Sequence, residues 1–134
     1  MHRLLRFAAI ASIAAAWLTS TAIAATTAQA LLASYSQAAA TQPDVKAGEA
    51  LFNATHGREW SCASCHTVNP TRGGRHASTG KPIQALAPAA GSDRFTDAAK
   101  VEKWFRRNCN DVLARECTAA EKANLLAWLM SLTP

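Results

Sequence analysis

The residues with the clearest chemical signature are two cysteines and a histidine in the run Cys62-Ala-Ser-Cys65-His66. In a helical turn, two thiols at this spacing can reach the two vinyl groups of a haem and form thioethers, and the imidazole that follows lies beneath the iron. The C-x-x-C-H run therefore predicts one covalently bound haem c, attached through Cys62 and Cys65, with His66 as an iron ligand. We expect the second ring nitrogen of His66 to donate to a carbonyl, for which Pro70 is a candidate.

The cysteine pair has three competing interpretations. A thioredoxin-like redox pair would need a βαβ setting, which the sequence does not suggest. A zinc site would need a second ligand pair at comparable spacing, whereas Cys109 and Cys117 lie eight positions apart. A plain disulfide framework is the third, because four cysteines allow three pairings. The adjacent histidine favours haem attachment over all three.

The ligand on the other side of the iron is less clearly marked. Electron-transfer cytochromes usually place a methionine there. Of the two methionines, Met1 begins the chain and Met130 falls in the last predicted helix, where packing explains it better. The remaining possibilities are no ligand at all, His56, His76, Asn108 and Asn110.

Asn108 has the best positional argument among these candidates. It continues an apolar series, Val101, Trp104 and Phe105, at the i, i+3, i+4 and i+7 spacing of one helix face. In a haem protein this face would point to the haem pocket. A cap at the end of the helix is the competing explanation for an asparagine at this position.

The N-terminal segment has the layout of a secretory signal peptide. A basic start up to Arg6 precedes an alanine-rich apolar run from Phe7 to Leu18 and a small-x-small cleavage pattern that ends at Ala24. The apolar run is too short for a membrane anchor, which needs about 18–20 apolar residues. We therefore expect residues 1–24 to be removed on export and residues 25–134 to form a single periplasmic domain.

The charge of the chain gives little indication of a polyanionic partner. The net charge is +5, and it falls to +3 without Arg3 and Arg6, because 12 basic residues then face 9 acidic ones. No basic cluster with interleaved aromatics argues for nucleic acid. The pairs Arg106/Arg107 and Arg72/Arg75 are best explained as solvated faces, with a contribution to meeting an acidic redox partner left open.

Helical patterns account for most of the remaining sequence. Residues 26–40 and 44–52 each read as a helix, and Gly48 inside the second suggests the close approach of another backbone. Residues 70–92 are rich in glycine and proline and should form a long loop. Thr96 is the predicted N-cap of the helix that carries Asn108, and Thr118 and Glu121 match a capping box before the last helix. Without an alternating strand pattern, the fold class is all-α.

Three segments closely resemble the sphaeroides haem protein family of bacterial cytochromes c, and the likeness spans nearly all of residues 25–134. They are Lys100–Thr118 with the run Arg-Asn-Cys-Asn, the loop Arg75–Ile83 with Leu86-Ala-Pro88, and Gly48–Phe52. The resemblance implies a class I cytochrome c fold with three main helices around the haem. It also implies contact between the first and last helices, which would place Gly48 against Trp128 or Leu129.

The resemblance also implies a function. The asparagine before the first cysteine of the C-terminal pair, Asn108, would be the sixth ligand of the oxidised iron, beside a Cys109–Cys117 disulfide. It would leave on reduction, and oxygen or nitric oxide would then bind. The electron donor would be a dihaem cytochrome c or a membrane cytochrome b. Whether the protein also catalyses a redox reaction of the bound ligand is left open. Two alternative functions also remain: a gas sensor, and a simple electron-transfer cytochrome with a permanently bound sixth ligand.

Overall fold

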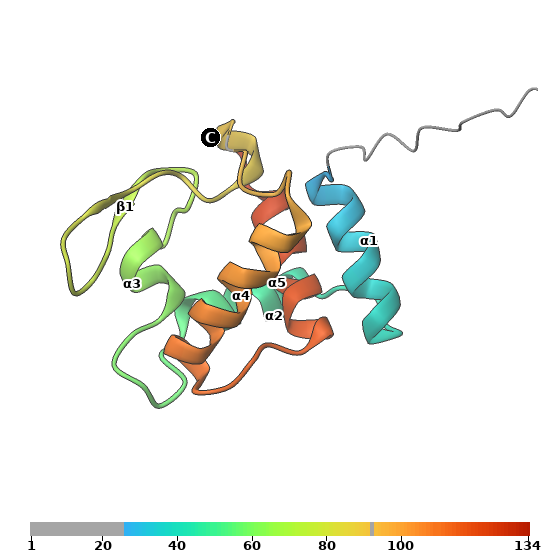
Figure 1. Ribbon diagram of the computed structural model, residues 1–134, viewed down its shortest axis with the longest axis horizontal. Coiled ribbons are helices and arrows are strands. Elements are labelled where there is room, and N and C mark those ends of the chain that lie inside the picture. Colours follow the sequence, from blue (N-terminus) through green and yellow to red (C-terminus); the bar gives the residue numbers. More distant parts are fainter. Residues whose placement is uncertain (1–25, 92) are drawn as a thin grey trace, which may run out of the picture.

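The computed structural model describes residues 26–91 and 93–134, so the predicted signal peptide at 1–24 lies outside the described residues. The described chain forms five α-helices, one antiparallel pair of short strands and one 3-10 turn (Figure 1). These are α1 (Ala28–Ala39), α2 (Val45–Asn53), α3 (Cys62–His66), β1 (Gly74–Arg75), β2 (Pro82–Ile83), η1 (Pro88–Ala90), α4 (Ala98–Leu113) and α5 (Ala119–Ser131).

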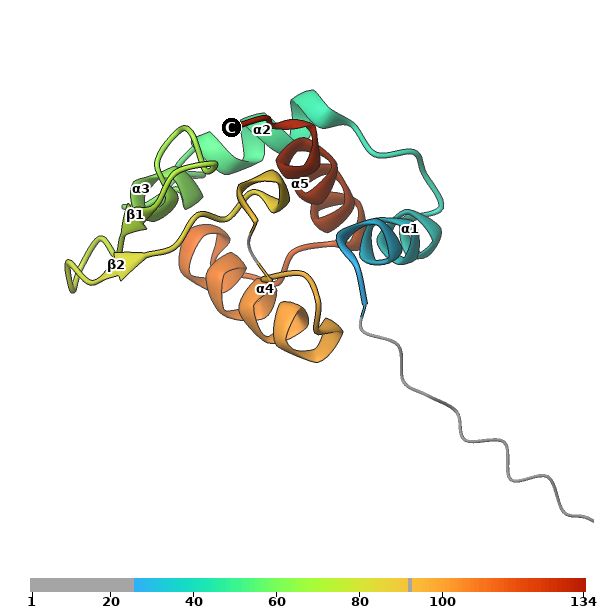
Figure 2. The same ribbon diagram turned by 90° about the horizontal axis from the view of Figure 1, so that it is seen from above.

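Helix α5 is the centre of the molecule. Helices α1 and α2 both pack closely along it, and α4 lies apart from the α2–α5 pair (Figures 1 and 2). Phe52 of α2 is fully buried with Leu126 and Leu129 of α5, and the rings of Phe52 and Trp128 lie 4.7 Å apart. The predicted contact between the early and last helices is therefore confirmed.

Gly48 explains how α2 and α5 come so close. A Cβ at this position would overlap the backbone carbonyl oxygen of Asn124. The backbone N–H of Asp44 also donates to the side-chain oxygen of Asn124 at 2.7 Å, which joins the start of α2 to the same turn of α5. Close backbone approach at Gly48 is thus confirmed, but Trp128 or Leu129 as its neighbour is wrong. The crossing point lies about one turn earlier in α5.

Of the two predicted N-caps, the one before α5 is confirmed and the one before α4 is wrong. Thr118 and Glu121 form the expected capping box at the start of α5. Helix α4, however, is capped by Asp97, whose carboxylate accepts from the Lys100 N–H at 3.0 Å, and not by Thr96. The Thr96 hydroxyl donates to the carbonyl of Asp93 at 2.7 Å, so it closes the preceding turn instead.

The predicted long loop contains more structure than its composition suggests. Strands β1 and β2 pair through Gly74 with Ile83 and Arg75 with Pro82, which modifies the all-α prediction without changing the mainly helical fold. Two residues per strand are too few to leave an alternating pattern in the sequence. The loop is closed at its base by the carbonyl of Pro70, which accepts from the N–H groups of Leu86 at 2.9 Å and Ala87 at 3.0 Å.

Helix α4 is joined to the other helices by a buried face and two side-chain links. Its residues facing the core are Val101, Phe105, Cys109 and Val112. Glu102 contacts side chains of α1 and α5, and Cys109 is bonded to Cys117 in the segment before α5. Among the helices that the structure describes, none is long and apolar enough to cross a membrane.

Candidate functional site

The cysteine pair lies on α3, a helix of only 5 residues. Its start is fixed by a capping box, in which the Ser61 hydroxyl accepts from the Ser64 N–H at 3.2 Å and the Ser64 hydroxyl accepts from the Ser61 N–H at 3.0 Å. Because residues three apart lie on the same side of a helix, Cys62 and Cys65 point to one side. Both thiols are half-buried and unpaired, so the structure does not join them in a disulfide. Burial raises the pKa of Cys62 to about 11, which keeps this thiol protonated at neutral pH.

His66 ends α3 and is half-buried. Its Nδ1 atom has no hydrogen-bond partner. Burial, and to a smaller extent the positive charge of Arg94, lowers the pKa of His66 to about 4, so the ring is neutral at pH 7. The neutral ring is the form that binds a metal. The prediction that the Pro70 carbonyl accepts from this ring is wrong, because Nδ1 makes no hydrogen bond and the Pro70 oxygen accepts from two backbone N–H groups at the base of the loop.

The β1–β2 hairpin lies directly against α3. A Cβ on Gly74 would overlap the carbonyl oxygen of Cys65, so only glycine permits this approach. The backbone N–H of Ala77, inside the hairpin, donates to the sulfur of Cys65 at 3.2 Å. The hairpin therefore holds α3 in place from one side, a function that the sequence reasoning did not assign to it.

The two candidate histidines outside α3 are engaged elsewhere. Nδ1 of His76 accepts from the backbone N–H groups of Ser78 at 3.3 Å and Thr79 at 3.4 Å. These bonds place the ring proton on Nε2, which leaves no lone pair there for a metal. Nε2 of His56 lies 2.8 Å from the carbonyl oxygen of Leu51, in the turn that follows α2. Both contacts count against these histidines as the sixth ligand.

Asn108 lies inside α4, so the alternative that it caps the end of this helix is wrong. At 100° per residue it falls at the edge of the buried face, between Val101 and Trp104. Asn108 is exposed, and Trp104 is 43% exposed despite its large apolar ring. The C-terminal half of α4, which carries Asn108, runs toward α3 in both views (Figures 1 and 2).

Asn110 lies on the opposite side of α4. It lines a shallow surface depression together with Lys103, Arg106, Arg107 and Glu116. This outward, basic face contrasts with the position of Asn108 beside the apolar residues. The helix geometry therefore favours Asn108 over Asn110 as a residue that faces a buried group.

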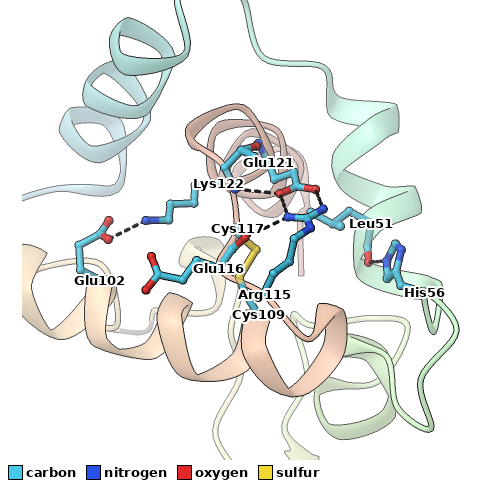
Figure 3. The surroundings of a disulfide bond; sticks show 10 residues. Leu51, His56, Glu102, Cys109, Arg115, Glu116, Cys117, Glu121 and Lys122 are labelled. Carbon is cyan, nitrogen blue, oxygen red and sulfur yellow. Dashed lines mark hydrogen bonds and ion pairs between the residues drawn. A yellow bond between two sulfur atoms is a disulfide. The ribbon is translucent and has the colours of Figure 1, made fainter.

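The disulfide is formed between Cys109 and Cys117, as the resemblance implied (Figure 3). It follows Asn108 directly and ties α4 to the start of α5. Beside it, the two terminal guanidinium nitrogens of Arg115 donate to the Glu121 carboxylate, at 2.8 Å and 2.7 Å. This interaction is the main reason that the pKa of Glu121 falls to about 2.

Two groups of residues in this region had no signal in the sequence. The guanidinium of Arg94 donates to the carbonyls of Ala85 at 3.0 Å and Gln84 at 3.1 Å, which fixes a positive charge near His66. Glu102 binds Tyr35 and Lys122, which are distant in sequence. Contacts at such separations follow from the packing of whole helices and leave no local pattern.

Comparison with known proteins identifies the family. Residues 38–129 match a family model described as a domain of unknown function, DUF1924. The cytochrome c-type protein SHP of Cereibacter sphaeroides is 52% identical over 103 residues, which cover 74% of this chain and 79% of that protein.

Two solved structures share the fold. One is oxidised SHP, described as an oxygen-binding cytochrome c, with a TM-score of 0.75 and 48% identity over 81% of this chain and 99% of that one. The other is the solution structure of cytochrome c'' from Methylophilus methylotrophus, studied for the structural basis of haem-ligand detachment. It has a TM-score of 0.71 and 39% identity over 80% of this chain and 94% of that one.

These relatives imply a covalent haem c, and the residues of this chain fit it. Two unpaired thiols lie on one short helix. A neutral, buried imidazole nitrogen without a partner lies at the end of that helix. A helix that leaves a large aromatic ring accessible runs toward them. The chain belongs to the DUF1924 family and has the fold of the SHP-like cytochromes c.

Proposed function

We propose that this chain is an exported cytochrome c with one haem, which accepts an electron from a partner cytochrome and releases Asn108 from the iron on reduction. It then binds oxygen or nitric oxide. The observation that carries the proposal is the position of Asn108 within α4, beside the Cys109–Cys117 bridge and on the side of the accessible Trp104. The description of SHP as an oxygen-binding cytochrome c supports the same conclusion.

Residues of α3 would hold the cofactor. Each thiol, on Cys62 and Cys65, would add across one haem vinyl group, so that an S–C and a C–H bond form and no atom is lost. The imidazole of His66 would bind the iron from the same helix, because the residue after the second cysteine follows it by a third of a turn. The hairpin at Gly74 would keep α3 fixed during these steps.

Asn108 would act as a ligand that depends on the oxidation state. Haem would supply an iron that accepts one electron, and His66 and Asn108 are the residues that would hold this iron in the oxidised state. The amide oxygen of Asn108 is a hard, neutral and weak donor, which suits ferric better than ferrous iron. Reduction would therefore weaken the hold of Asn108, and its withdrawal would let a diatomic ligand bind in its place. Trp104 would shield this position from water.

The electron donor follows from the family resemblance, which implies a dihaem cytochrome c or a membrane cytochrome b. A simple electron-transfer cytochrome would need a sixth ligand that stays bound in both oxidation states. His76 is the strongest such ligand by residue type, but two backbone N–H groups occupy its Nδ1. This hydrogen bonding supports Asn108 and a ligand-binding function.

Absorption spectra of the purified protein test the proposal. We expect a low-spin ferric form, and a high-spin ferrous form that shifts at once when carbon monoxide is added. Asn108→Ala should convert the ferric form to a high-spin spectrum. Asn110→Ala, two positions along on the opposite side of α4, is the matched control and should leave the spectrum unchanged.

Two results would contradict the proposal. A ferrous form that is low-spin and ignores carbon monoxide would mean that the sixth ligand stays bound and that the protein is an electron shuttle. A ferric spectrum that is unchanged in Asn108→Ala but altered in Asn110→Ala would assign the ligand to the other asparagine.

A further inference from the structure

A polar network joins α4 to two other helices. The hydroxyl of Tyr35, on α1, donates to one carboxylate oxygen of Glu102 at 2.6 Å. The ammonium of Lys122, on α5, donates to the other oxygen at 2.6 Å. The same ammonium lies 5.6 Å from the ring centre of Tyr35 and 5.7 Å from that of Phe105. Glu102 therefore fixes α4 against α1 and α5 at once.

The network rests on well-packed side chains. Tyr35 is buried, and its ring meets that of Phe105 edge to face with centres 5.7 Å apart. The Lys122 side chain is 15% exposed, whereas that of Glu102 is 43% exposed. A carboxylate between a hydroxyl and an ammonium has little freedom to move, since hydrogen bonds to charged groups are the strong ones.

Asn108 lies between two fixed points of α4. Glu102 precedes it by six residues, about 9 Å along the helix axis at 1.5 Å per residue. Cys109, bonded to Cys117, follows it directly. Because a helix is stiff over this length, the two links together set the position of α4 along its axis and its rotation about that axis at Asn108.

We propose that Glu102 is a positioning residue for the iron ligand: its bonds to Tyr35 and Lys122 hold α4 where the Asn108 amide reaches the iron. The inference rests on the proposed function, in which Asn108 is the ligand of the oxidised state. An amide oxygen is a weak ligand, so a small displacement of α4 is enough to shift the balance between bound and released Asn108. Loss of the network therefore favours release in the ferric protein.

Competition by an added ligand measures this balance. Imidazole binds ferric iron only where Asn108 has left, so its apparent affinity rises with the released fraction. In Glu102→Gln and Tyr35→Phe holoprotein, we expect the ferric affinity for imidazole to rise about three- to tenfold. The ferrous affinity for carbon monoxide should stay unchanged, because Asn108 has already left. Lys103→Ala, which removes an exposed charge from the side of α4 that carries Asn110, is the control and should change neither affinity.

The outcomes separate the two proposals. If Asn108→Ala raises ferric imidazole affinity but neither network variant does, the positioning inference is wrong and the proposed function stands. If Asn108→Ala also has no effect, Asn108 is not the ligand and both fail. Ferric and ferrous affinities that rise together would indicate general loosening and overturn the inference. Tyr35→Phe keeps the packing on Phe105, so it decides the matter if Glu102→Gln does not fold.

Discussion

Substitution of Gly48 by alanine tests the helix crossing that supports the site. The added methyl group would overlap the Asn124 carbonyl oxygen, which belongs to the α5 backbone and cannot rotate away. The two helices must separate, and the packing of Phe52 on Trp128 is lost in part. Overpacking of this kind costs about 1–3 kcal/mol, and alanine regains about 1 kcal/mol in helix propensity. Because the overlap is with backbone atoms, we expect a cost at the upper end of this range and a net loss of about 2 kcal/mol.

The loss is measurable by urea denaturation of the holoprotein, followed by circular dichroism at 222 nm. Thermal unfolding should shift downward by roughly 5–10 °C for a domain of this size. Glu49→Ala, at the neighbouring exposed position of α2, is the matched control and should unfold within about 0.5 kcal/mol of the unaltered protein. A Gly48→Ala protein that is as stable as the unaltered one would show that the crossing has room for a side chain, and the reasoning would fail.

Three further predictions concern the cofactor, the disulfide and acid stability. Cys62→Ala with Cys65→Ala should abolish covalent haem, as seen by haem staining after denaturing electrophoresis; haem that survives denaturation would contradict the attachment. Replacing Cys109 and Cys117 by alanine opens a link across a sequence separation of 8, which should lower the unfolding free energy by about 2.5 kcal/mol and raise the high-spin fraction of the ferric form. The pKa of Glu121 is lowered to about 2 from an ordinary value of 4.5, so its contribution is complete above pH 4.5 and is lost as the pH falls toward 2. Glu121→Gln should remove about 1 kcal/mol of this acid dependence, a small value because the partner Arg115 is exposed; acid unfolding that is unchanged would refute it.

The parts of the fold that local chemistry determines could be predicted from the sequence. Thr118 and Glu121 satisfy each other within one turn, so their capping box is visible as a spacing. Gly48 indicated a close backbone because glycine is costly inside a helix, but its partner in α5 depends on the crossing of the whole helices. The cap of α4 was misassigned by one residue, because Thr96 and Asp97 are both good caps and the preceding turn takes Thr96.

In the site, too, local features could be predicted from the sequence, whereas features that depend on the packing of distant segments could not. The spacing of Cys62, Cys65 and His66 is a local pattern, so the sequence alone predicts haem attachment there. The Tyr35–Glu102 contact joins residues 67 positions apart and could not be found before the packing of α1 on α4 was known. The bonds to His76 also depend on the tight turn of the hairpin, so the sequence does not indicate that its Nδ1 is already occupied.

The closure of the long loop at Pro70 has a consequence for engineering. Since one carbonyl holds both Leu86 and Ala87, the intervening residues form a unit whose base is fixed independently of its tip. Gly80 at the tip has a left-handed backbone, and a Cβ at this position would point into open space. Lengthening a loop costs little, about 0.6 kcal/mol for each doubling. An affinity tag or a fluorescent label inserted at the tip should therefore leave the base of the loop at Pro70 intact. The bond from the Ala77 N–H to the Cys65 sulfur, three residues before Gly80, is the contact with the attachment helix that such an insertion would put at risk.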